Sequence, residues 1–372
     1  MVHPLQKTAQ KILDLADIKI NGDRPWDIAV LNDNLYARVL RHGSLGLGEA
    51  YMDGWWESKQ LDECISHLLR AHIDKKINLK LKNLLEFARQ IIMNYQRPAK
   101  AFEVGEHHYD LGNDLYRAML DRRLTYTCAY WKNAKTLDEA QEAKLDLVCR
   151  KLNLQPGQRI LDIGCGWGSF MKYAAEKYGV TCVGITVAAE QVKLGRELCR
   201  GLPIEIRLED YRKVAGQFDH IISLGMFEHV GLKNYRTYMD VVARCLKNDG
   251  LFLLHTFGFP ISDRHSDPWI EKYIFPNYFL PSVAHIARAV EGCFIIEDWH
   301  NFGADYDTTL MAWFHNFDAH WGELKAHYSE RFYRMWKYYL MVCAGSFRSR
   351  TNQLWQVVLS KKGVMGGYQS VR

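Results

Sequence analysis

The residues whose spacing most clearly suggests chemistry are three glycines, Gly164, Gly166 and Gly168, placed directly after a short apolar segment. The stretch from 160 to 168 reads I-L-D-I-G-C-G-W-G, and an amphipathic pattern follows it from 170 to 178. Glycine has no Cβ, so a loop rich in it can turn tightly and bring its backbone close to a ligand. The spacing is not the G-x-G-x-x-G of dinucleotide enzymes. The stretch predicts a strand, a loop and a helix that hold another nucleotide-like ligand.

The same stretch, with its acid at Asp162, resembles motif I of S-adenosylmethionine-dependent methyltransferases. S-adenosylmethionine is a sulfonium cation, so its site needs hydrogen-bond acceptors and aromatic faces besides the loop. An acidic residue about 20 residues beyond the loop normally accepts the ribose hydroxyls. Here the second strand ends in Thr186, so Thr186 and Gln191 are expected to share that task, unless the ribose is held differently. The predicted donor-binding residues are Tyr126, Thr127, Asp162, Gly164, Cys165, Gly166, Trp167, Gly168, Thr186, Gln191, Asp210 and Tyr211.

Four further side chains, Cys128, Glu228, His255 and Tyr306, fall in separate loops or strand ends. Taken singly, a buried thiol, a paired carboxyl group or a core histidine is usually structural. Because all four are expected at the same edge of one sheet, together they could bind a small anion or move a proton. Zinc is the competing interpretation. No pair of possible ligands has the spacing of a zinc site, so no metal is predicted.

The elements that must position these residues are apolar runs that alternate with helical patterns. Runs at 181–186, 204–208, 218–223 and 251–256 follow the strand of the glycine loop. This alternation predicts an α/β fold with a Rossmann-like, parallel, doubly wound sheet, in which ligands bind at the carboxyl ends of the strands. A final strand at 354–360 closes this catalytic domain. A capping-box pattern, T-L-D-E, begins a long helix before the glycine loop.

Residues 1–95 are interpreted as a smaller, mainly helical domain that docks on lipid, and residues 96–372 as the catalytic domain. The glycines between 43 and 54 indicate tight turns, and the two tryptophans after them are interpreted as core rather than as ligand contacts. A Lys-rich amphipathic connector at 74–97 ends the first domain. It is either a helix with one solvated face or an interfacial helix that meets anionic headgroups, with ~1 kcal/mol for each cation.

Composition excludes several classes of protein. With 48% hydrophobic, 24% charged and 13% aromatic residues among 372, the chain is not disordered, and large cores or an apolar pocket are expected. The net charge of +5 fits a weak attraction to anionic surfaces, either membrane or nucleic acid. Cysteines without a C-x-x-C pair indicate reduced thiols in the cytoplasm. The lack of a secretory pattern or a run of ~18 apolar residues indicates that any membrane contact is peripheral.

Longer motifs give a closer resemblance. They are G-S-L-G-L-G-E-x-Y-M-D-G-W-W at 43–56, Y-D-L-G-N-D-L-Y at 109–116, Y-T-C-A-Y-W at 126–131, G-M-F-E-H-V-G at 225–231, D-P-W-I-x-K-Y-I-F-P at 267–276 and D-W-H-N-F-G-A-D-Y-D-T-T-L at 298–310. By these motifs, which are spread over nearly the whole chain, the sequence resembles the bacterial cyclopropane-fatty-acyl-phospholipid synthases.

The resemblance implies a reaction and a second ligand. That family transfers a methylene unit from S-adenosylmethionine to the cis double bond of an acyl chain in a membrane phospholipid, through a carbocation-like transition state. A bound bicarbonate is taken to be the base that closes the cyclopropane ring. The residues that would hold it are Cys128, Glu228, His255, Tyr306 and the backbone of Phe257. Cys343 matches a further motif cysteine and ranks below these residues as a catalytic candidate. A homodimer at the inner face of the cell membrane, with an anionic membrane surface and no nucleic acid as its partner, is also implied.

Two alternatives stay open at this point. A lipid methyltransferase with the same fold and motifs would stop at a methyl-branched or hydroxylated acyl product. A lipid-binding protein with a vestigial fold is disfavoured, because the glycine loop and all the expected anion-site residues are present. The high aromatic content suits the cyclopropane interpretation, since an aromatic pocket shields a carbocation from water and stabilises it through ring faces.

Overall fold

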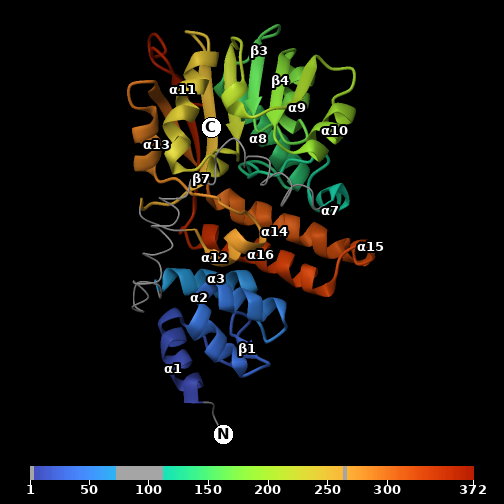
Figure 1. Cartoon of the computed structure of the whole chain (residues 1–372), viewed down its shortest axis with the longest axis vertical. Coiled ribbons are helices and arrows are strands. Elements are labelled where there is room, and N and C mark those ends of the chain that lie inside the picture. Colours follow the sequence, from blue (N-terminus) through green and yellow to red (C-terminus); the bar gives the residue numbers. More distant parts are fainter. Residues whose placement is uncertain (1–3, 73–111, 263–265) are drawn as a thin grey trace. The chain divides into compact units, whose positions relative to one another are not determined.

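The structure is a computed structural model that describes residues 4–72, 112–262 and 266–372 (Figure 1). Contacts within the chain divide it into two compact units, which are described separately below. The first unit falls within residues 1–90, 265–276 and 306–352, and the second within residues 91–264, 277–305 and 353–372.

The second unit is built on a seven-stranded sheet with the order β5-β4-β3-β6-β7-β9-β8. Its strands are β3 (Arg159–Ile163), β4 (Thr181–Thr186), β5 (Ile204–Leu208), β6 (His220–Leu224), β7 (Leu251–Gly258), β8 (Ile295–Asn301) and β9 (Gln353–Ser360). Strands β3 to β7 pair in parallel, with β3 between β4 and β6. The predicted α/β, Rossmann-like fold is therefore confirmed, and the strand order reverses between β3 and β6.

The last two strands depart from the parallel arrangement, because β9, whose direction the sequence interpretation left open, pairs antiparallel with both β7 and β8. The start of β9 lies opposite the end of β8, with Trp355 beside Asn301. The chain between them, residues 302–352, leaves and returns at the same edge of the sheet. A parallel β9 would need a crossover to the opposite edge, so β9 has to run back against its neighbours.

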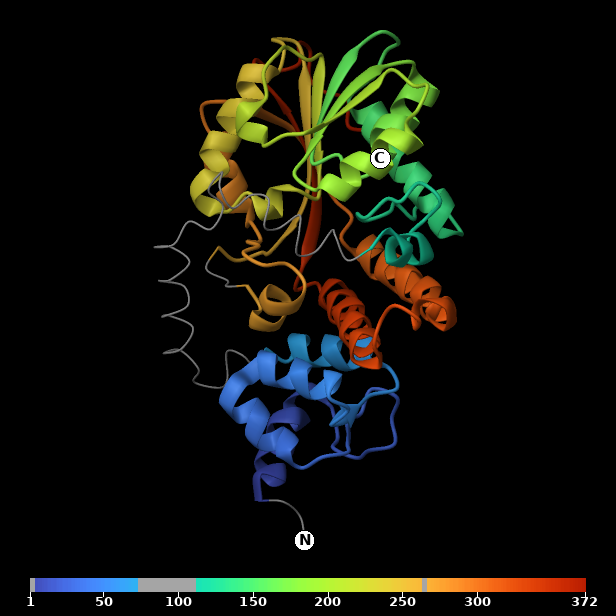
Figure 2. The ribbon, with the colours of Figure 1, turned by 45° about the vertical axis from the view of Figure 1, so that its right-hand side comes forward.

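Helices cover both faces of this sheet (Figures 1 and 2). On one side they are α8 (Leu137–Lys151), α9 (Ser169–Tyr178) and α10 (Ala189–Leu198), and on the other α11 (Tyr235–Cys245) and α13 (Val283–Val290). Because alternate strand residues point to opposite faces, Leu161 and Ile163 of β3 join the core under α11, whereas Ile160 joins the core under α8. Asp162 follows the same alternation and lies on the α8 face.

The predicted capping box is present at the start of α8. The Thr136 side chain accepts from the backbone N–H of Glu139, and the Glu139 side chain accepts from the N–H of Thr136. Two backbone donors that helix geometry leaves without partners are thus satisfied. This fixes the register of α8, which carries two fully buried lysines, Lys144 and Lys151, on the side that faces the sheet.

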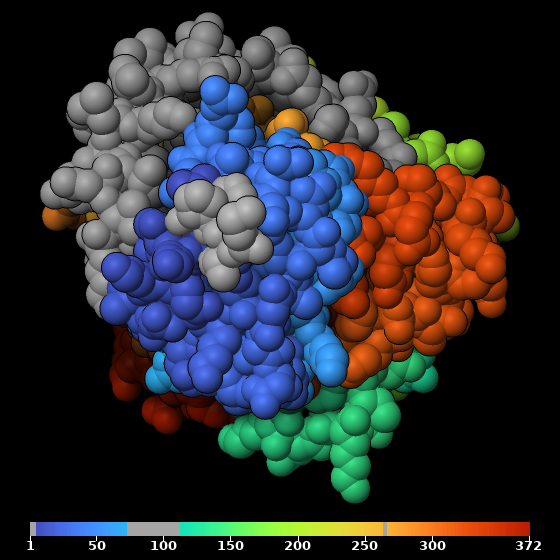
Figure 3. Space-filling model, turned by 90° about the horizontal axis from the view of Figure 1, so that it is seen from below, coloured from blue at the N-terminus to red at the C-terminus, as the bar shows by residue number. Residues whose placement is uncertain are grey.

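The first unit is mainly helical. Its elements are α1 (Pro4–Leu13), α2 (Asn34–Met52), α3 (Leu61–Arg70), α12 (Pro268–Tyr273), most of α14 (Ala304–Ala319), α15 (Trp321–Leu324), α16 (Glu330–Arg348) and the paired strands β1 (Ala29–Val30) and β2 (Trp56–Glu57). Helix α16 packs against both α2 and α3. Figure 3 shows the N-terminal residues in blue next to the orange α14–α16 segment.

The tight turns predicted from the glycines at 43–54 are only partly correct. Helix α2 runs through most of this stretch, and Gly43 is the point at which its backbone leaves helical geometry, with φ 56° and ψ −132°. Gly48 lies inside the helix, where a Cβ would be 2.4 Å from Cδ1 of Trp269. The glycine there serves close packing rather than a turn. Trp56, after the glycines, is fully buried, in agreement with its interpretation as core.

The predicted domain boundary near Pro98 and the Lys-rich connector at 74–97 lie outside the described residues. The first unit also contains 265–276 and 306–352, which the sequence interpretation placed in the catalytic domain. Their aromatic side chains complete the core of the N-terminal residues: the ring of Tyr338 lies 5.3 Å from that of Tyr51 and 6.4 Å from that of Trp56. Within the described ranges, no helix is long and apolar enough to cross a membrane.

Candidate active site

The glycine loop follows β3 and has the backbone geometry that its sequence predicts. The φ angles are +88° at Gly164, +54° at Gly166 and +86° at Gly168, a region that side chains disfavour. A Cβ on Gly164 would lie 2.6 Å from the Cβ of Met226, whereas open space surrounds the corresponding position at Gly166. The N–H of Gly164 donates to the carbonyl oxygen of Ile185 at 2.9 Å. The loop thus turns tightly at the end of β3 and presents bare backbone at Gly166.

A pocket lies beside this loop, where the strand order reverses, which is the usual ligand position in such sheets. The predicted donor-binding residues that line it are Tyr126, Thr127, Asp162, Gly164, Cys165, Gly166, Trp167, Thr186, Gln191, Asp210 and Tyr211. The exception is Gly168, which caps the start of α9. A Cβ there would lie 2.8 Å from the Sγ of Cys199, so Gly168 is required for packing behind the loop.

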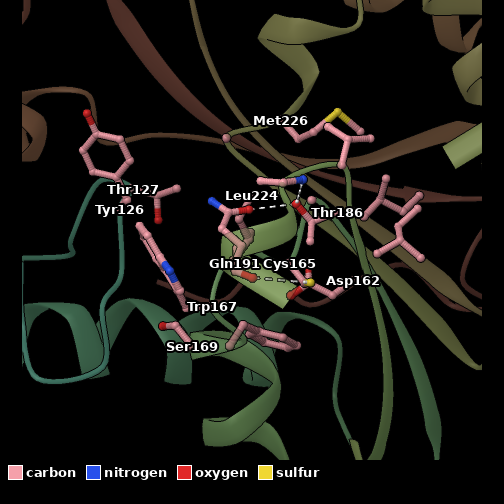
Figure 4. Close-up of a pocket in the computed structure, with 18 of the residues that line it drawn as sticks. Tyr126, Thr127, Asp162, Cys165, Trp167, Ser169, Thr186, Gln191, Leu224 and Met226 are labelled. Atoms are coloured by element: carbon pink, nitrogen blue, oxygen red, sulfur yellow. Dashed lines mark hydrogen bonds between the residues drawn. The ribbon is translucent and has the colours of Figure 1, made fainter. Parts of the chain in front are cut away.

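One wall of the pocket is aromatic. In Figure 4, Tyr126, Thr127 and Trp167 lie on one side of the pocket, opposite Thr186. The rings of Tyr126 and Trp167 both pack against Tyr116, with centroid distances of 5.3 Å and 4.9 Å. The indole Nε1 of Trp167 also donates to Oδ1 of Asn113 at 3.1 Å. Ring faces held in this way suit a bound sulfonium cation.

The opposite wall supplies polar atoms. The hydroxyl of Thr186 donates to Oε1 of Gln191 at 2.7 Å, so the two residues predicted to act together are in contact. Oδ1 of Asp210 accepts from the backbone N–H and the Nε of Arg212, both at 2.9 Å. Its Oδ2 is buried without a partner among the described residues. Asp210 therefore keeps one acceptor for a ligand hydroxyl, beside the role expected of Thr186 and Gln191.

Sequence reasoning missed some residues that line the pocket. They include Lys144, Glu209, Leu224, Gly225, Met226 and His229. Glu209 follows β5, and Gly225 and Met226 follow Leu224, the last residue of β6, so a stricter use of the strand-end rule would have included them. Lys144 comes from the middle of α8. A lysine in an amphipathic helix is normally solvated, so no sequence pattern marks this one as buried.

The floor of the pocket contains a buried lysine and a buried carboxyl group. Nζ of Lys144 donates to Oγ1 of Thr127 at 2.7 Å. Burial lowers the pKa of Lys144 to about 8, and the nearby Asp121 raises it. Burial raises the pKa of Asp162 to about 7, and Lys144 opposes this effect. Oδ1 of Asp162 is buried without a hydrogen-bond partner in the part of the chain that the structure describes.

Glu228 lies in the 3₁₀ turn Phe227–His229 after β6 and is 1% exposed. Its Oε1 accepts from the hydroxyl of Thr256 and from the backbone N–H of Phe257, both at 2.8 Å. Its Oε2 is buried and has no partner within the described ranges. Burial raises the pKa of Glu228 to about 7, against the effect of these hydrogen bonds. A carboxyl group with this pKa and one available oxygen can accept or donate a proton near neutral pH.

His255 lies on β7, two residues before Phe257, and is also 1% exposed. It pairs across the sheet with Gln356 of β9, whose Nε2 lies 3.2 Å from Nδ1 of His255. An amide N–H that donates to Nδ1 leaves the ring proton of a neutral imidazole on Nε2. Burial, followed by the charge of Lys144, lowers the pKa of His255 well below its usual value. Nε2 has no partner among the residues described.

The expected anion-site residues are distributed over both units. Glu228, His255 and Phe257 lie together at the ends of β6 and β7, and the N–H of Phe257 is bound to Glu228. Cys128 is fully buried in the same unit, and its Sγ donates to the carbonyl oxygen of Ala129 at 3.2 Å. Tyr306 belongs to the first unit.

Tyr306 packs against other aromatic rings of the first unit, and Cys343 is half-buried in the same unit. The ring of Tyr306 lies 4.6 Å from that of Phe347 and 5.9 Å from that of Trp313. Burial raises the pKa of Cys343 to about 12. A thiol with this pKa is almost entirely protonated at neutral pH and is a poor nucleophile. This agrees with its low rank among the catalytic candidates.

The fold and the pocket define a class of protein. A sheet that reverses its strand order at β3, a glycine loop after that strand and a pocket at the reversal are the features of class I S-adenosylmethionine-dependent methyltransferases. This is the class that the glycine motif predicted.

Comparison with known proteins places the chain within that class. The family described as mycolic acid cyclopropane synthetase matches residues 96–357. The chain is 54% identical over 366 residues to cyclopropane-fatty-acyl-phospholipid synthase of Escherichia coli K12. The matched region covers 98% of this chain and 96% of that protein. It is 32% identical over 359 residues to tuberculostearic acid methyltransferase UfaA1 of Mycobacterium tuberculosis, covering 89% of this chain and 82% of the other.

A solved structure agrees with these relatives. The mycolic acid cyclopropane synthase CmaA1, in complex with SAH and CTAB, has a TM-score of 0.66 at 33% identity, over 70% of this chain and 98% of CmaA1. The chain belongs to the cyclopropane synthase family. The resemblance read from its motifs is confirmed.

Proposed function

We propose that this protein transfers a methylene group from S-adenosylmethionine to the cis double bond of an unsaturated acyl chain in a membrane phospholipid. The observation that carries the proposal is the loop 225–230. Gly225 and Met226 line the donor pocket, whereas Glu228 of the same loop is hydrogen-bonded to Phe257 on β7. The N–H of Gly225 also donates to the carbonyl oxygen of His255 at 2.9 Å. One short loop therefore adjoins both a donor pocket and a buried pair of proton-handling groups.

S-adenosylmethionine would supply a methyl group on a positively charged sulfur, which leaves as S-adenosylhomocysteine. The backbone at Gly166 and the Oδ2 of Asp210 are the groups of the chain that would bind and orient this donor. Orientation is important because an alkene is a weak nucleophile and needs its target aligned at close range. The ring faces of Tyr126 and Trp167 would stabilise the positive charge that passes from sulfur to carbon.

Ring closure requires loss of a proton from the transferred carbon, and Glu228 and His255 are the buried groups suited to that step. A pKa of about 7 lets Glu228 hold or release a proton near neutral pH. The neutral His255 presents an N–H at Nε2, provided that Gln356 occupies Nδ1. Their burial excludes water that would otherwise trap a carbocation as an alcohol.

We further propose that a bicarbonate ion bound at this place takes the proton. Two buried atoms without partners among the described residues, Oε2 of Glu228 and Nε2 of His255, fit an ion that can both donate and accept hydrogen bonds. The charge of Lys144, which acts on Cys128 and on His255, favours an anion nearby. By resemblance, Cys128 and Tyr306 complete the set. Turnover is expected to fall in bicarbonate-depleted buffer and to recover when bicarbonate alone is added.

The place of action follows from the substrate. We propose that the enzyme works in the cytoplasm as a peripheral protein at the inner face of the cell membrane, on phospholipids in an anionic bilayer. Its net charge of +5 and its Lys-rich connector support this assignment.

We also infer a homodimer. Strand β8 is an edge of the sheet, and Ile295 and Ile296 on it are 47% and 41% exposed. Edge strands with exposed apolar side chains are usually covered in stable proteins. The molar mass by light scattering is expected to be that of two chains. A single-chain mass at the concentrations used for assay contradicts the inference.

The alternative is a lipid methyltransferase that stops at a methyl-branched or hydroxylated product. The similarity to UfaA1, which is named as a methyltransferase, supports this alternative. The test is to incubate the protein with oleoyl phospholipid vesicles and labelled methyl donor. A mass gain of one methylene with loss of the olefin signal supports cyclopropanation. A branched or hydroxylated product supports the alternative, and an unchanged olefin contradicts both.

A further inference from the structure

Helix α8 holds one side of the donor pocket through two residues placed one turn apart. Nε2 of Gln141 donates to the carbonyl oxygens of Thr127 at 2.8 Å and of Thr125 at 3.2 Å. Nζ of Lys144 donates to the hydroxyl of Thr127 at 2.7 Å. Thr127 is thus bound through both its backbone and its side chain, and it lies on the pocket wall beside Tyr126 (Figure 4).

The burial of Lys144 calls for an explanation beyond packing. The side chain is 0% exposed, and in the part of the chain that the structure describes its hydrogen-bond partner is the neutral hydroxyl of Thr127. A buried ammonium group is costly unless it is paired, and an apolar side chain of similar size generally packs as well or better. The carboxyl groups that act on its charge, Asp121 and Asp162, are themselves buried.

The segment that Lys144 holds connects the two halves of the site. Tyr126 precedes Thr127 and lines the donor pocket, and Cys128 follows it and belongs to the expected anion site. The charge of Lys144 acts on groups in both halves, on Asp162 in the pocket and on Cys128 and His255 near the base. A shift of Thr127 would therefore move the donor wall and the anion site together.

We propose that Lys144 is a positioning residue for methylene transfer: its ammonium group holds the Thr127 hydroxyl and thereby fixes the segment that bears Tyr126 and Cys128. The proposal rests on the proposed function. Nothing in the sequence pattern or in the expected reaction assigns Lys144 a role. Donor binding and proton removal would then both depend on the one buried contact between Lys144 and Thr127.

The test is a double-mutant cycle on the contact between Lys144 and Thr127. The variants are K144M, T127V, the double variant K144M/T127V, and T127S, which keeps the hydroxyl. The readouts are the Kd of S-adenosylhomocysteine by calorimetry without lipid, kcat and KM for the donor on oleoyl vesicles, and the Tm. K151M is the matched control, because Lys151 is equally buried on the same helix but pairs with Asp298 and His300.

K144M and T127V are each expected to raise the Kd about tenfold and to lower kcat, and the double variant is expected to be no worse than the worse single one. T127S should recover most of the loss that T127V causes. K151M should leave the Kd within about twofold of the wild type. A structural role alone would lower the Tm of K144M and K151M alike without this coupling.

Additive effects in the cycle overturn the proposal, and so does a K144M variant with a wild-type Kd and kcat. If K144M fails to fold, the comparison of T127V with T127S decides the matter, since equal losses in both contradict a role for the hydroxyl. The Kd is measured without lipid, so it separates this proposal from the proposed function. A wild-type protein that makes no cyclopropane would contradict the proposed function. The binding cycle on Lys144 and Thr127 would still give a result in that case.

Discussion

Glu228 lies in surroundings that favour the neutral form of its carboxyl group. One oxygen accepts two hydrogen bonds from β7, and the other is buried without a partner among the described residues. An unpaired buried donor or acceptor is costly, so such an atom usually has a functional use. At the scale of single residues, the same argument applies to Nε2 of His255 and to Oδ2 of Asp210. Glu228 and His255 belong to the anion site that we propose, and Asp210 belongs to the proposed donor site.

Replacing Glu228 with Gln is expected to lower turnover at least about a hundredfold, because the carboxyl group that would hold the bicarbonate base and receive its proton is lost. The Kd of S-adenosylhomocysteine should stay within about threefold of the wild type, since Glu228 does not line the donor pocket. Initial rates on oleoyl vesicles and calorimetry measure the two effects. Glu291→Gln, on the exposed turn after α13, is the control. If donor binding collapses in E228Q, the residue belongs to the donor site instead.

The pH dependence of stability follows from the same burial. The pKa values of Glu228 and Asp162 are raised to about 7 in the folded protein, so each stabilises the fold fully below its unfolded pKa and loses this effect as pH rises through 7. E228Q and D162N should therefore become more stable relative to the wild type between about pH 5.5 and about pH 8.5, by roughly 2 kcal/mol each. Urea unfolding at the two pH values measures this. An equal difference at both values would show that the folded pKa is not raised.

Turning to the elements, the strands and the glycine loop were predictable because their signals are local. Apolar runs, turn glycines and a capping box depend on neighbours in sequence. The reversed direction of β9 was not predictable from the sequence, because it depends on where residues 302–352 return to the sheet. Gly48 was misread as a turn because its reason is the indole of Trp269, distant in sequence. Lys144 was missed because only the fold shows which face of α8 covers the pocket.

Arg348 at the end of α16 connects three helices of the first unit. Its guanidinium binds Asp307 of α14 at 2.9 Å and 3.0 Å, and Asp62 and Glu63 of α3 at 2.6 Å and 2.7 Å. The group is partly exposed, so solvent weakens these pairs. R348M should still destabilise the protein by about 2 kcal/mol, because one change removes a shared cation from three carboxylates.

The matched control is R331M on the same helix, which removes a single pair with Asp53 and should change the free energy of unfolding by less than about 1 kcal/mol. Urea unfolding of both variants makes the comparison. If R348M and R331M lose the same free energy of unfolding, the contacts of Arg348 with three helices add no more stability than a single surface ion pair.

For the whole molecule, the class of fold and the family follow from motifs, whereas the grouping of the chain into units does not. The N-terminal residues share a core with 265–276 and 306–352, and aromatic contacts such as Tyr51 with Tyr338 create that grouping. Contacts of this kind join residues far apart in sequence, so composition and linkers do not reveal them. The Lys-rich connector, by contrast, is defined by its sequence alone.

Replacing Lys75, Lys76, Lys80 and Lys82 with Ala is expected to weaken binding to anionic vesicles and to make binding less sensitive to salt, because each cation contributes ~1 kcal/mol near a charged surface. Vesicle sedimentation over a range of salt concentrations measures both. Neutral vesicles are the control. Unchanged binding would identify the connector as an ordinary solvated helix face.

Cyclopropane formation is tested most directly with S-adenosylmethionine that carries a fully deuterated methyl group and with oleoyl phospholipid vesicles, the products being examined by mass spectrometry and NMR. If the enzyme builds a cyclopropane and removes one proton from the transferred carbon, the ring methylene retains two deuterium atoms, the third is lost and the olefin signal disappears. An acyl product that keeps all three deuterium atoms as a methyl branch would contradict the account.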